Sequence, residues 1–382
     1  GTLVALGPDY GRTGFDGGKY VARILNGENP ANIPIYQTPE TQLYINMDVA
    51  KKLNYSFPNN VLKRASKIID NSKSNTASLN NNNNSAKSKK MAVMIFNENQ
   101  LLMTVYKGLM DGLNSIGILN KYNIKVDQKN AQGDYALGQT VADYIVNEKY
   151  DYIVTISTPA LQLMANANKK IPHVFGAVTD PYSLGVAKNN NIHRDNLTGL
   201  ATFQPVDRTF QVMRKIFPNA KKVGIVWNPA EPCSQACTYK ARASAQKYNF
   251  QLIEKNVSNT SEVLDALNSL VDKKIDIFLT SGDNTVNVAV QSISNILKKN
   301  KIPYFTNTYS DIKVGAFCTV GADYYEVGQE LAKVATRVIS GENPKNIPIK
   351  DYLPEKVDFN YQLAKQWGIR ISNDLQQYLT SN

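Results

Sequence analysis

Residues 91–116 read MAVMIFNENQLLMTVYKGLMDGLNSI, and this stretch decides the fold class. It opens with an apolar run of strand length, Met91–Phe96, which a short polar loop follows. Apolar side chains then recur every three or four residues, as on one face of a helix, at Leu102, Val105, Leu109, Leu113 and Ile116. A buried strand that leads directly into an amphipathic helix predicts the first half of a βαβ unit.

The same pairing of an apolar run with a helical pattern recurs along the chain. Strands are predicted at Met91–Phe96, Ile124–Asp127, Tyr152–Ile156, Val174–Val178, Val223–Trp227, Leu252–Glu254, Ile275–Leu279 and Tyr304–Thr306. Four of these runs precede an extended segment near residue 200, and four follow it. This order predicts an α/β protein of two similar lobes, each a parallel sheet with helices on both faces.

Three segments are expected to carry the chain between the lobes, near residues 199–206, 320–325 and 350–359. The first two are extended runs that end in an acidic helix start. With these crossings, lobe 1 comprises residues 91–200 and 324–348, and lobe 2 comprises residues 205–320 and 356–382.

An internal repeat connects the two ends of the chain. Residues 1–35 match residues 315–349 at a constant offset of 314, with 15 identities. The longest shared runs are Gly-Glu-Asn-Pro and Asn-Ile-Pro-Ile, at positions 27–30 and 32–35 of the first segment. Agreement of this length indicates that the two segments are homologous.

The repeat divides the chain into three parts. We interpret residues 1–72 as the tail fragment of a preceding homologous copy, because a tail that evolved to complete a larger sheet has no core of its own. Residues 73–90 are polar and Asn-rich, so they are predicted to form a flexible linker. Residues 91–382 then form one complete domain.

Composition excludes several function classes. No apolar run approaches the roughly 18–20 residues that cross a membrane. The net charge of +11 comes from lysines and arginines that do not gather into a basic stripe, so we expect no nucleic-acid partner. The chain begins without an initiator methionine or a signal peptide, so we expect a processed or truncated product whose export signal is not in the chain.

Histidines and cysteines are too few for a metal site or a disulfide framework. His173 and His193 have no partner at metal-ligand spacing. Cys233 and Cys237 are expected to be free thiols, and Cys318 is expected to lie in the core. We therefore predict no metal, no cofactor and no catalytic residue.

Polar and small residues follow the predicted strands, at the edge of a parallel sheet where ligands bind. Ser157 and Thr158 precede Pro159, which is a capping pattern at a helix start. Free backbone N–H groups at such a start attract anions. The candidate ligand-binding residues are Asn97, Glu98, Ser157, Thr158, Thr179, Asp180, Glu231, Ser234, Asp283, Asn284 and Asn307.

The charge types in this set indicate a ligand class. Helix starts and hydroxyl groups suit a carboxylate, whereas the four acidic side chains suit an ammonium group. Together they predict a zwitterion such as an amino acid. Aromatic side chains near the strand ends are candidates to stack on a flat ligand, namely Phe96, Tyr182, Phe203, Trp227 and Tyr309.

Residues 91–382 resemble the substrate-binding proteins of ABC transporters, in the group that includes tryptophan- and tyrosine-binding members. The matching stretches run in order along that span: Ser157–Ala160, Ala177–Pro181, Thr198–Gly199, Gln204–Val206, Asn228–Glu231, Gly282–Val286 and Gly321–Tyr325. Residues 1–72 resemble the C-terminal portion of the same family. Two loops depart from the usual family pattern, at Phe96–Asn99 and at Pro232–Cys233.

The resemblance implies a two-lobed type I periplasmic-binding-protein fold that captures a small molecule by hinge closure. Aromatic amino acids are the ligands it suggests. It also implies an exported protein, periplasmic or lipid-anchored at the outer face of the cytoplasmic membrane, with an ABC permease as its partner. We expect a monomer.

Two other functions fit less well. An enzymatic function is not favoured, because the sequence has no Gly-x-Ser-x-Gly nucleophile turn and no histidine placed as a general base. A ligand-sensing transcriptional regulator or signalling receptor can share the fold. A regulator of this kind carries a DNA-reading helix-turn-helix ahead of its lobes, where this chain has a tail fragment and a linker. Solute binding is therefore favoured, with the sensor as the alternative.

Overall fold

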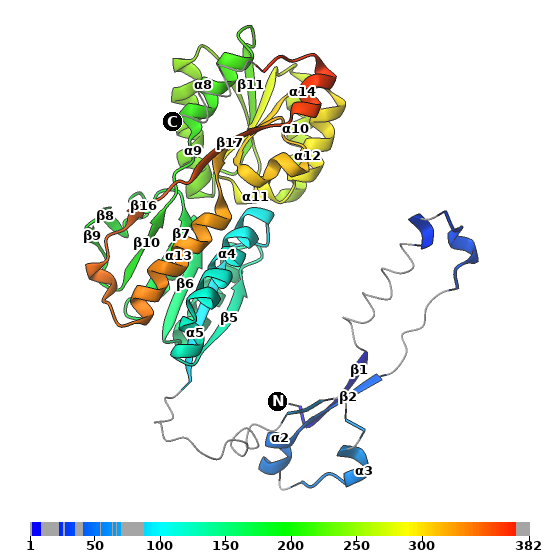
Figure 1. The fold of residues 1–382 in the computed structure, drawn as a ribbon, viewed down its shortest axis with the longest axis vertical. Helices are drawn as coiled ribbons and strands as arrows, with labels where there is room; N and C mark the ends of the chain where they lie inside the picture. Colours follow the sequence, from blue (N-terminus) through cyan, green and yellow to red (C-terminus); the bar gives the residue numbers. More distant parts are fainter. Residues whose placement is uncertain are drawn as a thin grey trace. The chain divides into compact units, whose positions relative to one another are not determined.

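The protein is described from a computed structural model. The described residues are 2–8, 23–25, 27–34, 41–53, 55–62, 64–65, 67–69 and 88–371. The chain divides into two compact units, Gly1–Ser85 and Ala86–Asn382 (Figure 1). Most of the predicted linker and the last residues of the predicted lobe 2 lie outside the described residues.

Lobe 1 of the second unit contains a six-stranded parallel sheet in the order β16-β10-β7-β6-β4-β5. The strands are β4 (Lys89–Ile95), β5 (Ile124–Asn130), β6 (Tyr152–Ile156), β7 (His173–Val178), β10 (Leu197–Ala201) and β16 (Lys350–Asp351). The helices are α4 (Gln100–Ile116), α5 (Ile118–Lys121), α6 (Tyr135–Asn147), α7 (Thr158–Ala167) and α13 (Tyr324–Ile339), and a small hairpin is formed by β8 (Ala187–Asn189) and β9 (Ile192–His193). Strand β6 is buried along its whole length because helices cover both faces of the sheet.

Lobe 2 contains a second six-stranded sheet, in the order β12-β11-β13-β14-β15-β17. The strands are β11 (Lys222–Trp227), β12 (Gln251–Asn256), β13 (Ile277–Thr280), β14 (Tyr304–Thr308), β15 (Cys318–Ala322) and β17 (Glu355–Phe359). The helices are α8 (Val206–Ile216), α9 (Pro232–Lys247), α10 (Val263–Asp272), α11 (Asn284–Asn287), α12 (Val290–Lys299) and α14 (Tyr361–Trp367). All strand pairs are parallel except β15 with β17, because β17 enters the lobe from the opposite direction.

The predicted two-lobed architecture with parallel sheets is confirmed, and so are the three crossings. The chain leaves lobe 1 after β10 and enters α8, leaves lobe 2 after β15 and enters α13, and returns between β16 and β17 (Figure 1). The eight predicted strands are all present: the bounds of Tyr152–Ile156 are exact, and no end of the others is shifted by more than three residues. The hydrophobic pattern was sufficient here because buried parallel strands are apolar along their length.

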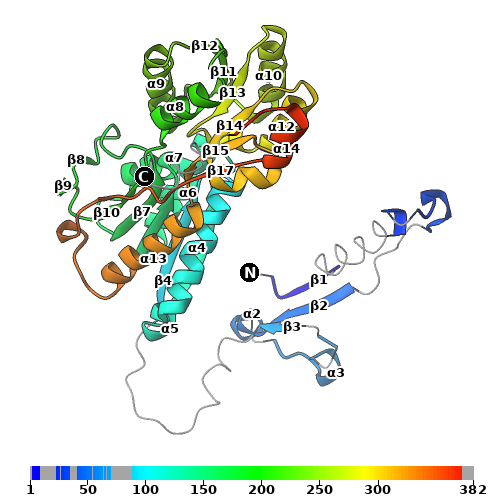
Figure 2. The same ribbon diagram turned by 45° about the horizontal axis from the view of Figure 1, so that its top comes forward.

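Helix α13 returns from lobe 2 and packs along α4, as Figures 1 and 2 both show. Two glycines permit the close approach. A Cβ at Gly108 would lie 2.2 Å from the Tyr325 carbonyl oxygen, and a Cβ at Gly328 would lie 2.2 Å from the Val105 carbonyl oxygen. The close packing of α13 on α4 holds the chain that leaves the second crossing against lobe 1.

The described part of the first unit contains β1 (Val4–Pro8), a 3-10 turn η1 (Pro30–Asn32), β2 (Thr41–Asn46), α2 (Met47–Lys52), α3 (Asn59–Leu62) and β3 (Lys67–Ile69). Its sheet has the order β1-β2-β3. Strands β1 and β2 are antiparallel, and β2 and β3 are parallel.

The first unit repeats, at the same offset of 314, the elements that end the second unit. Val4 lies opposite Ile45 in the β1–β2 pair, and Cys318 lies opposite Phe359 in the β15–β17 pair, so both antiparallel pairs have the same register. Other features recur at this offset: the ion pairs Arg23–Glu28 and Arg337–Glu342, the turn caps Asn29 and Asn343, and the helix caps Asn46 and Asn360. The sequence repeat is therefore also a structural repeat.

Gly7 and Gly321 occupy equivalent positions with different surroundings. A Cβ at Gly321 would lie 1.8 Å from the Asn307 carbonyl oxygen in β14, whereas a Cβ at Gly7 would meet nothing within 4 Å. Gly321→Ala should therefore lower the free energy of unfolding of the second unit by about 1–3 kcal/mol, the usual effect of overpacking.

Gly7→Ala is the matched control and should change that free energy by less than about 0.5 kcal/mol. Urea unfolding followed by tryptophan fluorescence isolates the second unit, because both tryptophans, Trp227 and Trp367, belong to it. Equal effects of the two substitutions would contradict the prediction.

Candidate ligand-binding site

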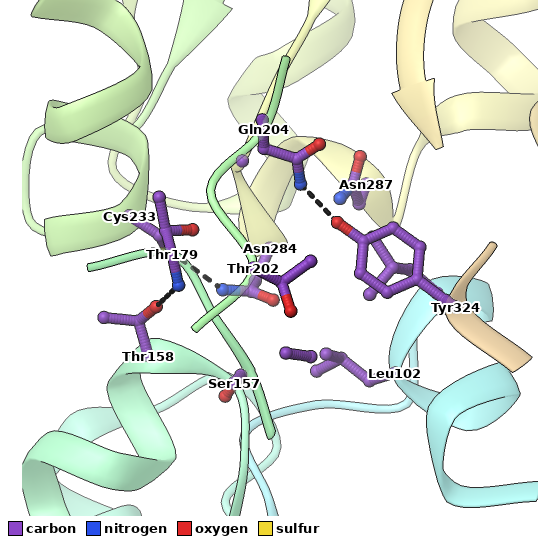
Figure 3. Close-up of a pocket in the computed structure, with 13 residues that line it drawn as sticks. Leu102, Ser157, Thr158, Thr179, Thr202, Gln204, Cys233, Asn284, Asn287 and Tyr324 are labelled. Carbon is purple, nitrogen blue, oxygen red and sulfur yellow. Dashed lines mark hydrogen bonds between the residues drawn. The ribbon is translucent and has the colours of Figure 1, made fainter. Parts of the chain in front are cut away.

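A small cavity lies between the two lobes, at the carboxyl ends of strands from both sheets. Its wall combines lobe 1, lobe 2 and the crossing segments, so neither lobe forms it alone (Figure 3). The lining residues are Leu101, Leu102, Ser157, Thr158, Ala177, Thr179, Thr202, Gln204, Cys233, Gly282, Asn284, Asn287 and Tyr324.

Lobe 1 contributes the start of α7 to this wall. Ser157 caps the helix, and its hydroxyl accepts a hydrogen bond from the Ala160 N–H at 3.4 Å. The Thr158 hydroxyl accepts one from the Thr179 N–H at 3.1 Å, which ties the helix start to the end of β7. The positive end of the helix dipole therefore lies at the cavity, where it favours an anion.

Backbone strain is present on the same wall. Ser157 has φ of 104° and Ala177 has φ of 53°, although neither residue is glycine. Such conformations cost on the order of 1–3 kcal/mol each and are concentrated at functional sites. The strain supports a role for this wall in binding rather than in stability alone.

The first crossing segment contributes two buried polar atoms without partners. The Thr202 hydroxyl and Gln204 Oε1 form no hydrogen bond within the described residues. The Gln204 side chain is nevertheless fixed, because its Nε2 donates to the Tyr324 hydroxyl at 2.5 Å (Figure 3). An unpaired buried polar atom costs about 1–3 kcal/mol, so both atoms are suited to bind a polar group of a ligand.

Lobe 2 closes the opposite side with Asn284 and Asn287 from α11 and Cys233 from the first turn of α9. The Cys233 thiol is free and buried. Burial and the neighbouring Glu231 carboxylate raise the pKa of this thiol well above its usual range. Cys233 therefore presents a neutral, weakly polar surface to the cavity at neutral pH.

A buried carboxylate stands behind this wall. Glu231 is fully buried, and its two oxygens accept hydrogen bonds from the backbone N–H and the side chain of both Asn284 and Thr285, at 2.6–2.9 Å. These four bonds satisfy the carboxylate within lobe 2. Glu231 therefore positions Asn284 and does not line the cavity itself.

Asp283 forms a second buried network beside it. Its carboxylate accepts hydrogen bonds from the N–H groups of Asn228 and Val286 and from the Ser234 hydroxyl, at 2.6–2.8 Å. Burial and the Glu231 carboxylate raise the pKa of Asp283 to about 7. The network joins the loops after β11 and β13 to α9, and so shapes the lobe 2 wall.

Hydrogen bonds across the cleft hold the lobes together. The Asn97 amide donates to the Asn284 carbonyl oxygen at 3.2 Å, and the Asn99 amide donates to Asn284 Oδ1 at 3.5 Å. The Tyr135 hydroxyl donates to the Ala230 carbonyl oxygen at 3.2 Å. These contacts indicate a closed arrangement of the two lobes.

Four of the eleven predicted residues line the cavity, namely Ser157, Thr158, Thr179 and Asn284. The other seven lie outside its lining. Asn97 bridges the lobes, Glu98 is exposed, and Asp180 faces an outer cleft. Glu231, Ser234 and Asp283 belong to the buried networks of lobe 2. The Asn307 side chain donates hydrogen bonds within lobe 2, to the Thr209 hydroxyl and the Val320 carbonyl oxygen. Direct ligand contact remains a prediction for each of the eleven residues.

The sequence prediction omitted the residues at the crossings, above all Thr202, Gln204 and Tyr324. Gln204 and Tyr324 stand in two of the family-like stretches, which was the available signal. None of the five predicted stacking residues lines the cavity, although Phe203 lines the outer cleft between α7 and α9. Tyr324 is the one aromatic side chain in the lining.

The composition of the lining limits what the site can hold. No charged side chain belongs to it. In the part of the chain that the structure describes, no group of three or more His, Cys, Asp or Glu side chains is arranged to hold a metal ion.

None of the described helices is long and apolar enough to cross a membrane.

A family model described as "ABC transporter substrate binding protein" matches residues 1–69 and 90–382. The chain belongs to this family. It is therefore the solute-binding component of an ABC-type importer, as the sequence favoured over the regulator alternative. Substrate-binding proteins of this kind bind small-molecule solutes, act outside the cytoplasm and work with a membrane permease.

Relatives of this substrate-binding protein include a tyrosine-binding protein from Clostridioides difficile, 31% identical over 82% of this chain and 90% of the relative. A Streptococcus pneumonia ABC domain in complex with L-Trp is 25% identical, with a TM-score of 0.72 over 76% of this chain and 98% of that one. The ligand-free, open structure of a Clostridium difficile substrate-binding protein with adhesive properties is 28% identical, with a TM-score of 0.57 over 75% of this chain and 97% of that one. The better superposition on the complex agrees with closed lobes.

Glu231→Ala should destabilise this substrate-binding protein strongly. The substitution leaves four buried donors on Asn284 and Thr285 without their acceptor, so we expect a loss of at least about 3 kcal/mol in the free energy of unfolding. Glu98→Ala, at an exposed carboxylate, is the control and should change it by less than about 0.5 kcal/mol. Urea unfolding measures both, and a stable Glu231→Ala variant would show that the network is dispensable.

Proposed function

We propose that this substrate-binding protein captures an amino acid with an aromatic side chain and delivers it to an ABC permease. The observation that carries the proposal is the cavity between the lobes, which has a helix start on one side, unpaired polar atoms on another and no charged side chain. A ligand with a net charge would be buried there without a counter-charge, which is costly. A zwitterion has no net charge and suits such a wall.

The ligand carboxylate is assigned to the start of α7. Ser157, Thr158 and Thr179 surround this end of the cavity, and hydroxyl donors together with the helix dipole suit a carboxylate. The side chain is assigned to the apolar part of the wall, which Leu101, Leu102 and Tyr324 share with other residues. The printed names of two relatives, one tyrosine-binding and one in complex with L-Trp, support an aromatic side chain.

The ligand ammonium group is assigned to the first crossing segment. Gln204 Oε1 and the Thr202 hydroxyl are acceptors without partners, and three N–H donors of an ammonium would satisfy them. The buried Glu231 carboxylate and, in its ionised form, the Asp283 carboxylate stand behind the opposite wall and add negative potential. They would therefore act on the ammonium at a distance, without the direct contact that the sequence suggested.

Capture is proposed to proceed by hinge closure about the three crossing segments. The ligand would bridge lobe 1 and the crossings while Asn284 closes from lobe 2. Because the closed form alone surrounds the ligand, ligand binding shifts the population toward it. We further propose that the protein works as a monomer, periplasmic or lipid-anchored at the outer face of the cytoplasmic membrane.

A thermal-shift screen of the full chain against the twenty amino acids, sugars and nucleosides tests the ligand class. At a hundredfold excess over Kd, a ligand adds about 2.7 kcal/mol of stability, which raises Tm by a few degrees. We expect selective shifts with tryptophan, tyrosine or phenylalanine. A shift with a sugar or nucleoside alone would keep the solute-binding function and refute the amino-acid proposal.

Gln204→Leu should weaken binding of L-tryptophan by roughly 5- to 150-fold, because it removes the acceptor assigned to the ammonium group. Gln162→Leu, in the outer cleft, is the matched control and should leave the affinity unchanged. Isothermal titration measures both variants.

A comparison ligand separates loss of the ammonium contact from general disturbance of the site. N-acetyl-L-tryptophan lacks the ammonium group, so the wild-type protein should discriminate strongly against it and Gln204→Leu should discriminate much less. Equal discrimination by the two proteins would place the ammonium group elsewhere.

A further inference from the structure

The first unit ends on an open strand edge. Strand β1 pairs with β2 on one side, and within the described residues no strand pairs with its other side. The equivalent strand of the second unit, β15, has β17 on one side and β14 on the other, with Phe305 opposite Cys318 and Thr306 opposite Thr319. Among the described residues of the first unit, none therefore forms a counterpart of β14.

The glycine at position 7 is explained by close approach of a strand equivalent to β14. Its equivalent, Gly321, must be glycine because the backbone of Asn307 in β14 passes where a Cβ would lie. Nothing lies within 4 Å of a Cβ at Gly7, so the first unit as described does not require glycine there. A glycine at this position is suited to close approach of a strand equivalent to β14.

Apolar side chains of the first unit lack the cover that their equivalents in the second unit have. Leu6 is 67% exposed, whereas Val320 is fully buried. Leu25 is 80% exposed, whereas Ile339 is 3% exposed in the lobe 1 core. An unpaired edge strand that carries an exposed apolar side chain, as β1 does with Leu6, is a template for strand addition.

We propose that the open edge of β1 is the docking edge for a strand equivalent to β14, supplied by a segment homologous to residues 88–314. In the second unit such a segment comes directly before Gly315 and is completed by residues 315–371. By the same order, the partner segment precedes residues 1–69 on the same polypeptide. Residues 1–69 then complete a second substrate-binding domain in tandem with the first.

The register of the docked strand follows from the offset of 314. The partner residues equivalent to Phe305 and Thr306 would lie opposite Val4 and Ala5, as the originals lie opposite Cys318 and Thr319. The partner backbone equivalent to Asn307 would pass over Gly7, as it does over Gly321. A substitution at Gly7 should therefore block docking while leaving the second unit undisturbed.

The test extends the full chain by a copy of its own residues 88–314, fused ahead of residue 1. Val314 then joins Gly1 as it naturally joins Gly315, so the first copy is rebuilt in the natural order. Hydrogen exchange followed by mass spectrometry measures the exchange rates of the β1 amide groups that form no hydrogen bond with β2. We expect these amides to exchange at least about tenfold more slowly in the extended chain than in the original chain.

Gly7→Val is the matched variant in both chains. It should abolish the added protection in the extended chain and change nothing in the original chain, since no neighbour there meets the new side chain. Equal exchange of β1 in the original and extended chains, or protection that survives Gly7→Val, would overturn the proposal. So would protection of β1 in the original chain alone, which would assign the edge to self-association. The readout involves no ligand, so it stands apart from the proposed function.

Discussion

The hydrogen bond from Gln204 to the Tyr324 hydroxyl joins the first two crossing segments, and the cavity is built around it. Gln204 follows β10, the last lobe 1 strand before the chain enters lobe 2, and Tyr324 begins α13, which returns to lobe 1 and packs on α4 through Gly108 and Gly328. The position of the Gln204 amide is thereby set by the rigid contact of two helices. Because Gln204 also lines the cavity, one residue takes part both in the hinge and in the proposed ligand site.

Two acidic residues near the strand ends of lobe 2 stabilise the conformation of neighbouring loops. Glu231 uses both oxygens on Asn284 and Thr285, and Asp283 uses its own on three donors from neighbouring loops. A buried carboxylate is tolerated when its bonding capacity is met, and it then holds short loops in one conformation. The polar wall of lobe 2 is therefore shaped by charges that the ligand does not touch, and a neutral cavity results.

The repeat shows one sequence pattern in two surroundings. The antiparallel pairs β1–β2 and β15–β17 have the same register, and the segments around them share a helix cap and an ion pair. These features depend on residues within about 45 positions of one another. Burial differs between the copies, since it depends on β14 and lobe 1, which come from distant parts of the chain. Local structure is thus retained where tertiary contacts are absent, and Gly7 retains the residue that those contacts require.

The α/β class, the eight strands, the three crossings and the internal repeat of this protein could all be predicted from its amino-acid sequence. Those features follow from hydrophobic periodicity and glycine, proline and capping residues, which act over a few neighbouring positions. The sequence also placed Ser157, Thr158 and Thr179 at strand ends that line the cavity. Two arrangements became visible in the folded protein alone. Glu231 and Asp283 accept hydrogen bonds from each other's loops, and Thr202, Gln204 and Tyr324 meet at the hinge. Hydrogen-bond satisfaction of a buried group depends on segments as much as 187 residues apart, as between Asn97 and Asn284, and no local pattern encodes such a partner.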